Sequence, residues 1–153
     1  MDGVDPLSTT EEALWRALMR IAVSLPRRLD GDLLQAVGIN VNEYVTLMYL
    51  SEAADRELRM SDLADVTAMS ASRMSRLVDE LQSRGLVTKR ASTEDGRGNV
   101  TRLTRSGLAK LTAAWGINIS SMRALVFDHV DPTAIEGGAQ AMVEIAARLE
   151  GRP

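Results

Sequence analysis

Apolar residues recur at helical spacing in the N-terminal part of the chain. Leu14, Leu18 and Ile21 follow one another at intervals of four and three residues, which predicts a helix over residues 9–29. Pro26 is expected to bend or interrupt the last turn of this helix, because a proline ring removes one backbone hydrogen bond. The pattern therefore opens with one long amphipathic helix.

A second helix is predicted after a short break. Residues 33–37 form an apolar piece that ends at Gly38, and glycine commonly terminates helices. Asn42 is expected to cap the next helix, because its side chain can accept a hydrogen bond from an unpaired backbone amide. This helix is expected to run to about Ala54.

Two short helices separated by a tight turn come next. Ser61 is suited to cap the first of them, and Ser70 is suited to cap the second, which is predicted over residues 71–84. The second helix stops at Gly85. Its inward stripe is expected to hold four apolar residues at the spacing i, i+3, i+4, i+7, namely Met74, Leu77, Val78 and Leu81.

A β-hairpin and two further helices complete the pattern. Residues 86–91 and 99–103 are rich in β-branched and alternating side chains, and the segment between them contains glycine, which predicts a hairpin. Helical periodicity returns at Thr104 and continues to about His129. Asp131 then caps a last helix, helped by a proline at the first helical position. The order predicts a mainly α-helical fold with a small β-hairpin wing, a winged helix-turn-helix.

Composition excludes several classes of protein. The 153 residues contain no cysteine, so disulfides and thiolate metal sites are ruled out, and they contain one histidine. Aromatic residues make up only 3%, which argues against a base-stacking platform for single-stranded nucleic acid. No apolar run approaches the roughly 18 residues of a membrane-spanning helix. The N-terminus is acidic and polar, unlike a secretory signal, so we expect a cytoplasmic protein without a membrane partner.

Charge is distributed unevenly along the chain. The net charge is −3, yet residues 56–110 contain eleven Lys or Arg against seven Asp or Glu, while the remainder contains seven against fourteen. A basic segment in an acidic protein is typical of a DNA-binding surface, because cations neutralise phosphates. An ordinary solvated face with mixed charges fits the same count.

The start of the helix at residues 71–84 has the chemistry of a DNA-reading surface. In a winged helix-turn-helix, this second helix can lie in the major groove with its N-terminal half against the bases. Arginine can bind guanine bidentately, and serine can contact bases or phosphate. A solvated helix face is the alternative interpretation. The candidate residues are Ser70, Ser72, Arg73, Ser75 and Arg76.

The hairpin supplies a second set of candidate contacts. Arg97 at its tip suits the negative potential of the minor groove. Asp95 is expected to hold Arg97 in one rotamer through a charge-assisted pair. A mobile charged turn is the alternative. The flanking cations Lys89, Arg90 and Arg102 complete the set.

These motifs, in this order, resemble the DNA-binding core of the MarR (multiple antibiotic resistance regulator) family. Two residues depart from the family pattern, because Arg73 stands where a small hydroxyl residue is common and Thr67 stands where an apolar residue is usual. The departures leave the operator sequence open. The segments that carry the resemblance are residues 60–65, 69–81, 84–90, 95–97 and 103–107.

The resemblance implies a homodimer that binds double-stranded DNA at a near-palindromic operator and regulates transcription. Its usual form is a repressor released by a small aromatic or anionic ligand. The chain is then one domain over residues 1–153, with dimerisation helices at 9–29 and 105–149 around a DNA-binding lobe at 39–104. The recognition helix is 71–84, and the Asp95 and Arg97 motif belongs to the wing.

A ligand pocket is expected between the dimerisation helices and the lobe. A small anionic aromatic compound needs one cation among apolar walls. The five candidates also suit a core or an ordinary surface. His129 is compatible with a helix end, a dimer contact or a pH-linked role. The pocket candidates are Trp15, Arg16, Met19, Tyr44 and Met48.

Two other classes of function stay open from the sequence. A winged-helix adaptor that binds proteins without reading DNA would keep the same fold. It would lose little partner binding when Arg73, Arg76 and Arg97 are removed together. A small hydrolase or transferase has no phosphate loop, nucleophile elbow or metal-ligand cluster in its favour. We therefore expect no enzymatic activity, no cofactor and no metal.

Overall fold

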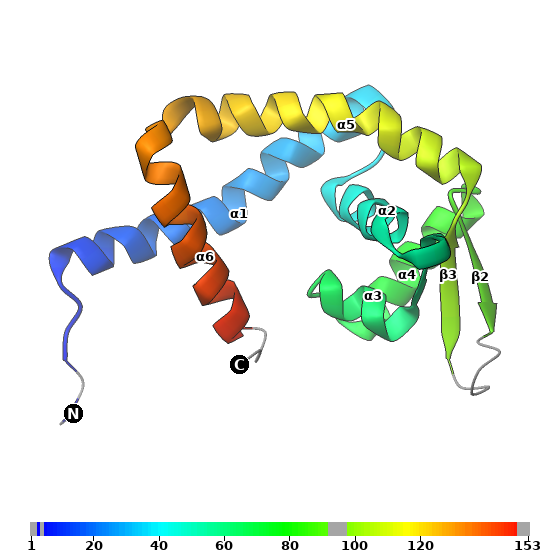
Figure 1. Cartoon of the computed structure of the whole chain (residues 1–153), viewed down its shortest axis with the longest axis horizontal. Helices are drawn as coiled ribbons and strands as arrows, with labels where there is room; N and C mark the ends of the chain where they lie inside the picture. Colours follow the sequence, from blue (N-terminus) through cyan, green and yellow to red (C-terminus); the bar gives the residue numbers. More distant parts are fainter. Residues whose placement is uncertain (1–2, 4, 92–97, 150–153) are drawn as a thin grey trace.

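The computed structural model describes residues 3, 5–91 and 98–149. Two long helices, α1 (Thr9–Val37) and α5 (Arg105–Leu125), pack against each other and form an arch over the molecule (Figure 1). A lobe of short helices and strands lies at one end of the arch. The helix α6 (Ile135–Leu149) descends at the other end. The mainly helical fold with a small sheet is as predicted.

The first helix is longer than predicted. Ser8 caps it, and it continues through Pro26 to Val37, where Gly38 ends it with the positive φ of 70° that glycine adopts readily. Pro26 and Ala22, whose carbonyl loses its helical donor, are both exposed, so solvent can satisfy that carbonyl. The predicted end at residue 29 was therefore wrong, and the apolar piece before Gly38 belongs to the same helix.

The second helix, α2 (Val41–Glu52), begins two residues earlier than expected. Its cap is Asn40, whose side chain accepts a hydrogen bond from the Glu43 amide at 2.9 Å. The Glu43 carboxylate accepts in return from the Asn40 amide at 2.8 Å. This reciprocal pair favours Asn40 over the predicted cap Asn42, which lies inside the first turn.

The helix-turn-helix consists of α3 (Met60–Val66) and α4 (Ala71–Ser83), which pack together under α2. Arg59 precedes α3 without a side-chain capping bond, so the expected cap Ser61 lies within the helix. The predicted inward stripe of α4 is confirmed. Met74, Val78 and Leu81 are fully buried, and Leu77 packs partly buried against the same core.

The sheet has one more strand than the sequence indicates. The predicted hairpin is present as β2 (Val87–Ala91) and β3 (Asn99–Leu103). A short 3₁₀ turn, η1 (Ala54–Arg56), leads into an extra strand, β1 (Glu57–Arg59), which pairs with the other side of β3. All pairs are antiparallel, in the order β1-β3-β2. Three residues are too few to show a periodic pattern.

The C-terminal helices differ from the prediction in detail. Thr104 caps α5, but the helix ends at Leu125 and is followed by the 3₁₀ turn η2 (Phe127–His129). Asp131 caps the next turn, η3 (Pro132–Ala134), which leads into α6. The buried stripe of α5 includes Leu111, Ala114, Asn118 and Ser121.

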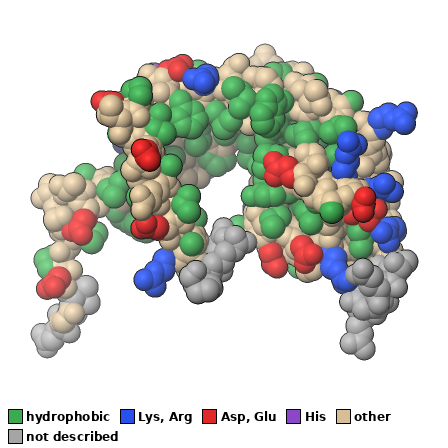
Figure 2. Space-filling view, viewed as in Figure 1, with side chains coloured by type: hydrophobic (Ala, Val, Ile, Leu, Met, Phe, Trp, Pro, Cys, Tyr) green, Lys and Arg blue, Asp and Glu red, His purple; other side chains and the backbone are tan. Residues whose placement is uncertain are grey.

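Apolar side chains are buried in the lobe and exposed on the arms. We use the term arms for the N-terminal half of α1, the C-terminal half of α5 from Trp115 onward, and α6. No residue of α6 is buried, and Val143 and Leu149 are 68% and 84% exposed. Trp115, in the middle of α5, is 55% exposed. Figure 2 shows hydrophobic side chains gathered along the inner side of the arch, around a hollow between α6 and the lobe.

Within the described part of the chain, no helix combines the length and apolar character needed to cross a membrane.

Candidate nucleic-acid interface

The N-terminal half of α4 presents polar and basic side chains to solvent. Ser70 caps the helix by accepting a hydrogen bond from the Arg73 amide at 3.4 Å, and its hydroxyl lies 3.5 Å from that of Ser72. The Arg76 Nε donates to the Ser72 carbonyl at 3.4 Å, which lays the guanidinium along the first turn. Ser75 is half-buried, and the other four candidates are exposed.

The turn that sets the angle of α4 is tightly bonded. Ala68 adopts a φ of +53°, and the Met69 amide donates to the Ala64 carbonyl at 2.9 Å. Thr67 donates its hydroxyl to the Leu63 carbonyl at 2.7 Å. The hydroxyl of Thr67 is therefore hydrogen-bonded to the preceding helix. This bond explains how the turn can hold a threonine where an apolar residue is usual in the family.

The other end of α4 is tied to the junction between α1 and α2. The Arg84 Nη1 lies 2.6 Å from the Glu43 Oε1, and its Nη2 donates to the Gly38 carbonyl at 2.7 Å. Glu43 is only 2% exposed, so its charge depends on this arginine and on the cap of α2. The orientation of the helix is thus fixed at both ends.

The sheet separates the predicted hairpin cations onto two faces. Successive residues of a strand point to opposite faces. Lys89 lies opposite the buried Thr101 and turns toward α4, where its Nζ lies 2.9 Å from the Asp79 Oδ1. Arg90 and Arg102 lie on the other, solvent-facing side. Lys89 and Arg90 therefore do not share one surface.

One carboxylate joins the two outer arginines. The Arg90 Nη2 lies 2.6 Å from the Glu57 Oε2, and the Arg102 Nε lies 3.4 Å from the Glu57 Oε1. The Glu57 side chain is 18% exposed, whereas both arginines are at least half exposed. Figure 2 shows Lys and Arg side chains along the edge of the lobe near β2 and β3. The wing residues Asp95 and Arg97 lie outside the described residues.

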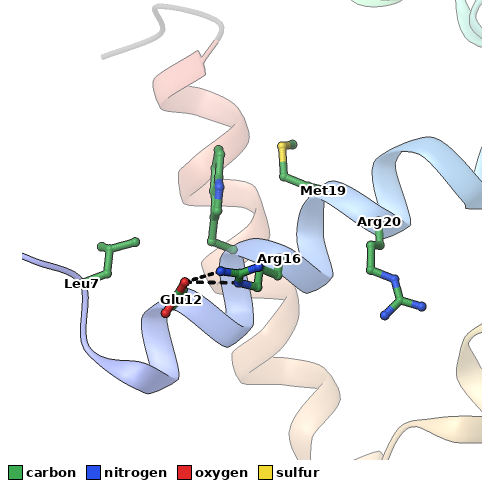
Figure 3. Close-up of a pocket in the computed structure, with 6 residues that line it drawn as sticks. Leu7, Glu12, Arg16, Met19 and Arg20 are labelled. Carbon is green, nitrogen blue, oxygen red and sulfur yellow. Dashed lines mark hydrogen bonds and ion pairs between the residues drawn. The ribbon is translucent and has the colours of Figure 1, made fainter.

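Three of the five ligand-pocket candidates share one groove at the N-terminal end of α1. Trp15, Arg16 and Met19 line a groove of about 680 Å³ together with neighbouring residues of the same helix and Leu7, which precedes it. Arg16 forms an ion pair with Glu12, one turn earlier (Figure 3). An anionic ligand would therefore compete with Glu12 for this guanidinium.

The other two candidates lie far from that groove, in α2 at the opposite end of the arch (Figure 1). Tyr44 is 3% exposed, and Met48 packs partly buried against the core. Burial raises the pKa of the Tyr44 hydroxyl, while a hydrogen bond with Asn118 of α5 lowers it in part. The structure does not bring the five candidates together within one chain.

The single histidine, His129, is the last residue of the 3₁₀ turn η2, which follows α5, and it is exposed. Its Nε2 lies 2.9 Å from the Ala124 carbonyl. His129 also lines a groove with Arg28 of α1 and the apolar residues Leu25, Leu125 and Val130. Among the residues that the structure describes, no group of three acidic or histidine side chains could hold a metal ion.

The acidic residues that organise the cations are not among the residues predicted from the sequence. Glu57, Glu43 and Asp79 each bind an arginine or a lysine that is distant along the chain. Glu57 is separated from Arg90 by 33 positions, so no local spacing rule could connect them. The alternation of strand residues could have separated Lys89 from Arg90 in advance.

Comparison with known proteins identifies relatives over most of the chain. The family model described as MarR family matches residues 37–98. The transcriptional repressor MprA of Escherichia coli (strain K12) is 31% identical over 93 residues, which cover 59% of this chain. The match spans 53% of that relative, so the chain accounts for about half its length.

Solved structures match over nearly the whole chain. AbsC, a MarR family transcriptional regulator from Streptomyces coelicolor, is 31% identical, with a TM-score of 0.88 over 97% of this chain and 100% of that one. Sco3205, another MarR family transcriptional regulator from the same organism, was solved in complex with DNA. It is 29% identical, with a TM-score of 0.90 over 97% of this chain and 93% of that one.

Proposed function

Because this chain belongs to the MarR family of transcriptional regulators, we propose that it acts as a homodimeric repressor. In this proposal it binds a near-palindromic operator in double-stranded DNA and is released from it by a small ligand. Members of the family are DNA-binding transcription regulators and not enzymes, which removes the hydrolase or transferase alternative.

One observation carries the DNA contacts that we propose. The exposed N-terminal half of α4 is held at a fixed angle by the turn before it and by the Arg84 contacts behind it. A chain of nearly the same fold, Sco3205, was solved with DNA. We therefore assign base contacts to Arg73 and Arg76 in the major groove, where arginine recognises guanine.

The proposed homodimer rests on the exposed apolar faces of the arms. Monomeric proteins rarely expose contiguous apolar patches larger than a few hundred Å². Trp15, Trp115, Val143 and Leu149 are each more than half exposed, and hydrophobic side chains line the hollow between α6 and the lobe (Figure 2). A second copy of the same chain offers matching faces, with its own α1, α5 and α6. Two recognition helices related by a twofold axis would then read a near-palindromic site.

Release by a ligand is supported by the groove at the N-terminal end of α1. The groove at Trp15, Arg16 and Met19 combines apolar walls with a cation, which suits a small aromatic acid. Because Arg16 is already paired with Glu12, such a ligand has to exchange one carboxylate partner for another. Tyr44 and Met48 lie in α2, at the opposite end of the arch. They can line this groove only if a second copy of the chain brings its α2 next to it.

DNA binding is tested by selecting duplexes from a random library and measuring affinity for the selected sequence at several salt concentrations. The logarithm of affinity should fall linearly with the logarithm of salt, at about 0.9 per phosphate contact. Arg76→Ala should weaken binding and alter base preference, while Arg97→Ala should weaken binding on every sequence.

Three outcomes would count against the proposal. A flat salt dependence would exclude binding through phosphates. Unchanged DNA binding after the triple substitution Arg73→Ala, Arg76→Ala and Arg97→Ala would exclude the contacts assigned to α4 and the wing, whereas a protein-binding adaptor would select no duplex at all. A stable monomer of 16.6 kDa at micromolar concentration in sedimentation would exclude the homodimer.

A further inference from the structure

The short strand β1 places a carboxylate in the middle of a basic face. Glu57 lies directly opposite Arg102 in the pairing of β1 with β3. Arg90, on β2, reaches across β3 to the same carboxylate. A set of arginines that only neutralised phosphates would have no need for this acid, which repels DNA.

The geometry gives each carboxylate oxygen one arginine. Glu57 Oε2 accepts from Arg90 at 2.6 Å, while Glu57 Oε1 lies 3.4 Å from the Nε of Arg102. Since the Glu57 side chain is only 18% exposed, solvent stabilises its charge poorly and the two arginines supply most of the compensation. Both arginine side chains keep about half of their surface in solvent, so they stay accessible to another anion.

The charge balance has a direct consequence for DNA binding. Two arginines and one glutamate carry a net charge of +1, so this cluster attracts phosphate less strongly than two unpaired arginines would. The carboxylate also restricts each long side chain to one arrangement, which reduces the ordering required when a phosphate meets that arrangement. Phosphates at other positions have to break a charge-assisted hydrogen bond first.

Resting on the DNA-binding function proposed above, we propose that Glu57 is a specificity-determining residue of the DNA interface. It positions Arg90 and Arg102 for the backbone of the correct site and limits their attraction to DNA of any other sequence. The ion pair between Lys89 and Asp79 is not part of this cluster. It lies on the inner face of the sheet, where it joins β2 to α4.

The test is Glu57→Gln, which keeps the size and hydrogen-bonding capacity of the side chain and removes its charge. Affinity is measured for a library-selected duplex and for a scrambled duplex of the same composition, over a range of salt. Glu52→Gln is the matched control, because it makes the same change in net charge at an exposed position on α2, outside the sheet. Thermal unfolding of each variant checks that the fold is retained.

We expect Glu57→Gln to bind the scrambled duplex roughly fivefold more tightly and to steepen its salt slope by about one unit, because one more cation is available to phosphates. The ratio of affinities for selected over scrambled DNA should fall by a similar factor. Glu52→Gln should leave the slope and the ratio near those of the unchanged chain. Equal behaviour of the two variants would overturn the role of Glu57.

A variant that lacks both arginines keeps the inference testable if Glu57→Gln lowers stability. In a chain that carries Arg90→Met and Arg102→Met, the substitution at Glu57 should no longer change the salt slope or the ratio, because its partners are gone. An undiminished effect in this background would also overturn the role. If the unchanged chain selects no sequence and its binding is insensitive to salt, the proposed function fails instead, which distinguishes the two failures.

Discussion

The lobe and the arms use their apolar side chains in opposite ways. In the lobe, Leu47, Leu63 and Met74 are fully buried within one chain. On the arms, residues of the same kind, such as Val143 and Leu149, are more than half exposed. The lobe therefore has the interactions that determine its own fold, whereas the arms have apolar faces that need a further surface to cover them. The predictions below test this contrast, from the largest expected effect to the smallest.

Removing core volume from the lobe should have the largest effect. Leu47→Ala deletes most of a side chain that has no exposed surface, which should lower the free energy of unfolding by about 3 kcal/mol because a cavity remains. Denaturant titration at a fixed protein concentration measures it. The matched substitution Leu149→Ala on α6 should cost far less in the monomer. Equal losses for both variants in a monomeric sample would contradict the contrast.

A charge on the apolar face of α6 should act on association and not on the fold of the lobe. Ile145→Glu places a carboxylate on an apolar arm, and in the proposed homodimer it should weaken self-association roughly 100-fold, because an unpaired charge would be buried. Analytical ultracentrifugation measures the dissociation constant. Gln140→Glu is the control, since it adds the same charge at an exposed position five residues earlier, about 140° around the same helix. If Ile145→Glu stayed as dimeric as the control, α6 would not belong to the interface.

Breaking the ion pair that connects the lobe to the arch should have the third-largest effect. Arg84→Met leaves the buried Glu43 carboxylate without its arginine, which should lower the free energy of unfolding by about 2 kcal/mol. The value is below that of a fully buried pair because Arg84 is one-third exposed. Arg73→Met removes an exposed arginine from the same helix and should change stability by less than about 0.5 kcal/mol. Chemical denaturation that gives similar losses for both would contradict the buried ion pair.

The sequence predicts elements best where periodicity acts within one helix. The stripe of Met74, Val78 and Leu81 and the cap at Ser70 follow from local rules, and all are present. Local rules also place the two hairpin strands. They fail at Pro26, because the cost of a proline inside a helix depends on whether the carbonyl that loses its donor can reach solvent.

The organisation of the candidate site depends on contacts that no local pattern contains. Glu57 meets Arg90 across a third strand, and Glu43 meets Arg84, which lies 41 positions further along the chain. The residue types of the cations could be predicted, but the acids that hold them depend on the packing of the whole lobe. The same holds for the arms. Their apolar faces indicate an interface, but they do not identify the residues that cover them.

The smallest effect should come from a glycine at the start of α6. Gly138 lies in a helix, and a Cβ added there would meet nothing within 4 Å, so Gly138→Ala should raise stability by about 1 kcal/mol through helix propensity alone. Gly107, at the start of α5, is the opposite case, because an added Cβ would lie 2.1 Å from the Leu86 carbonyl oxygen. Gly107→Ala should therefore destabilise the lobe. Thermal unfolding and sedimentation of both variants separate the two environments. If Gly138→Ala instead weakened the dimer, the backbone of α6 would approach the second copy closely at this residue.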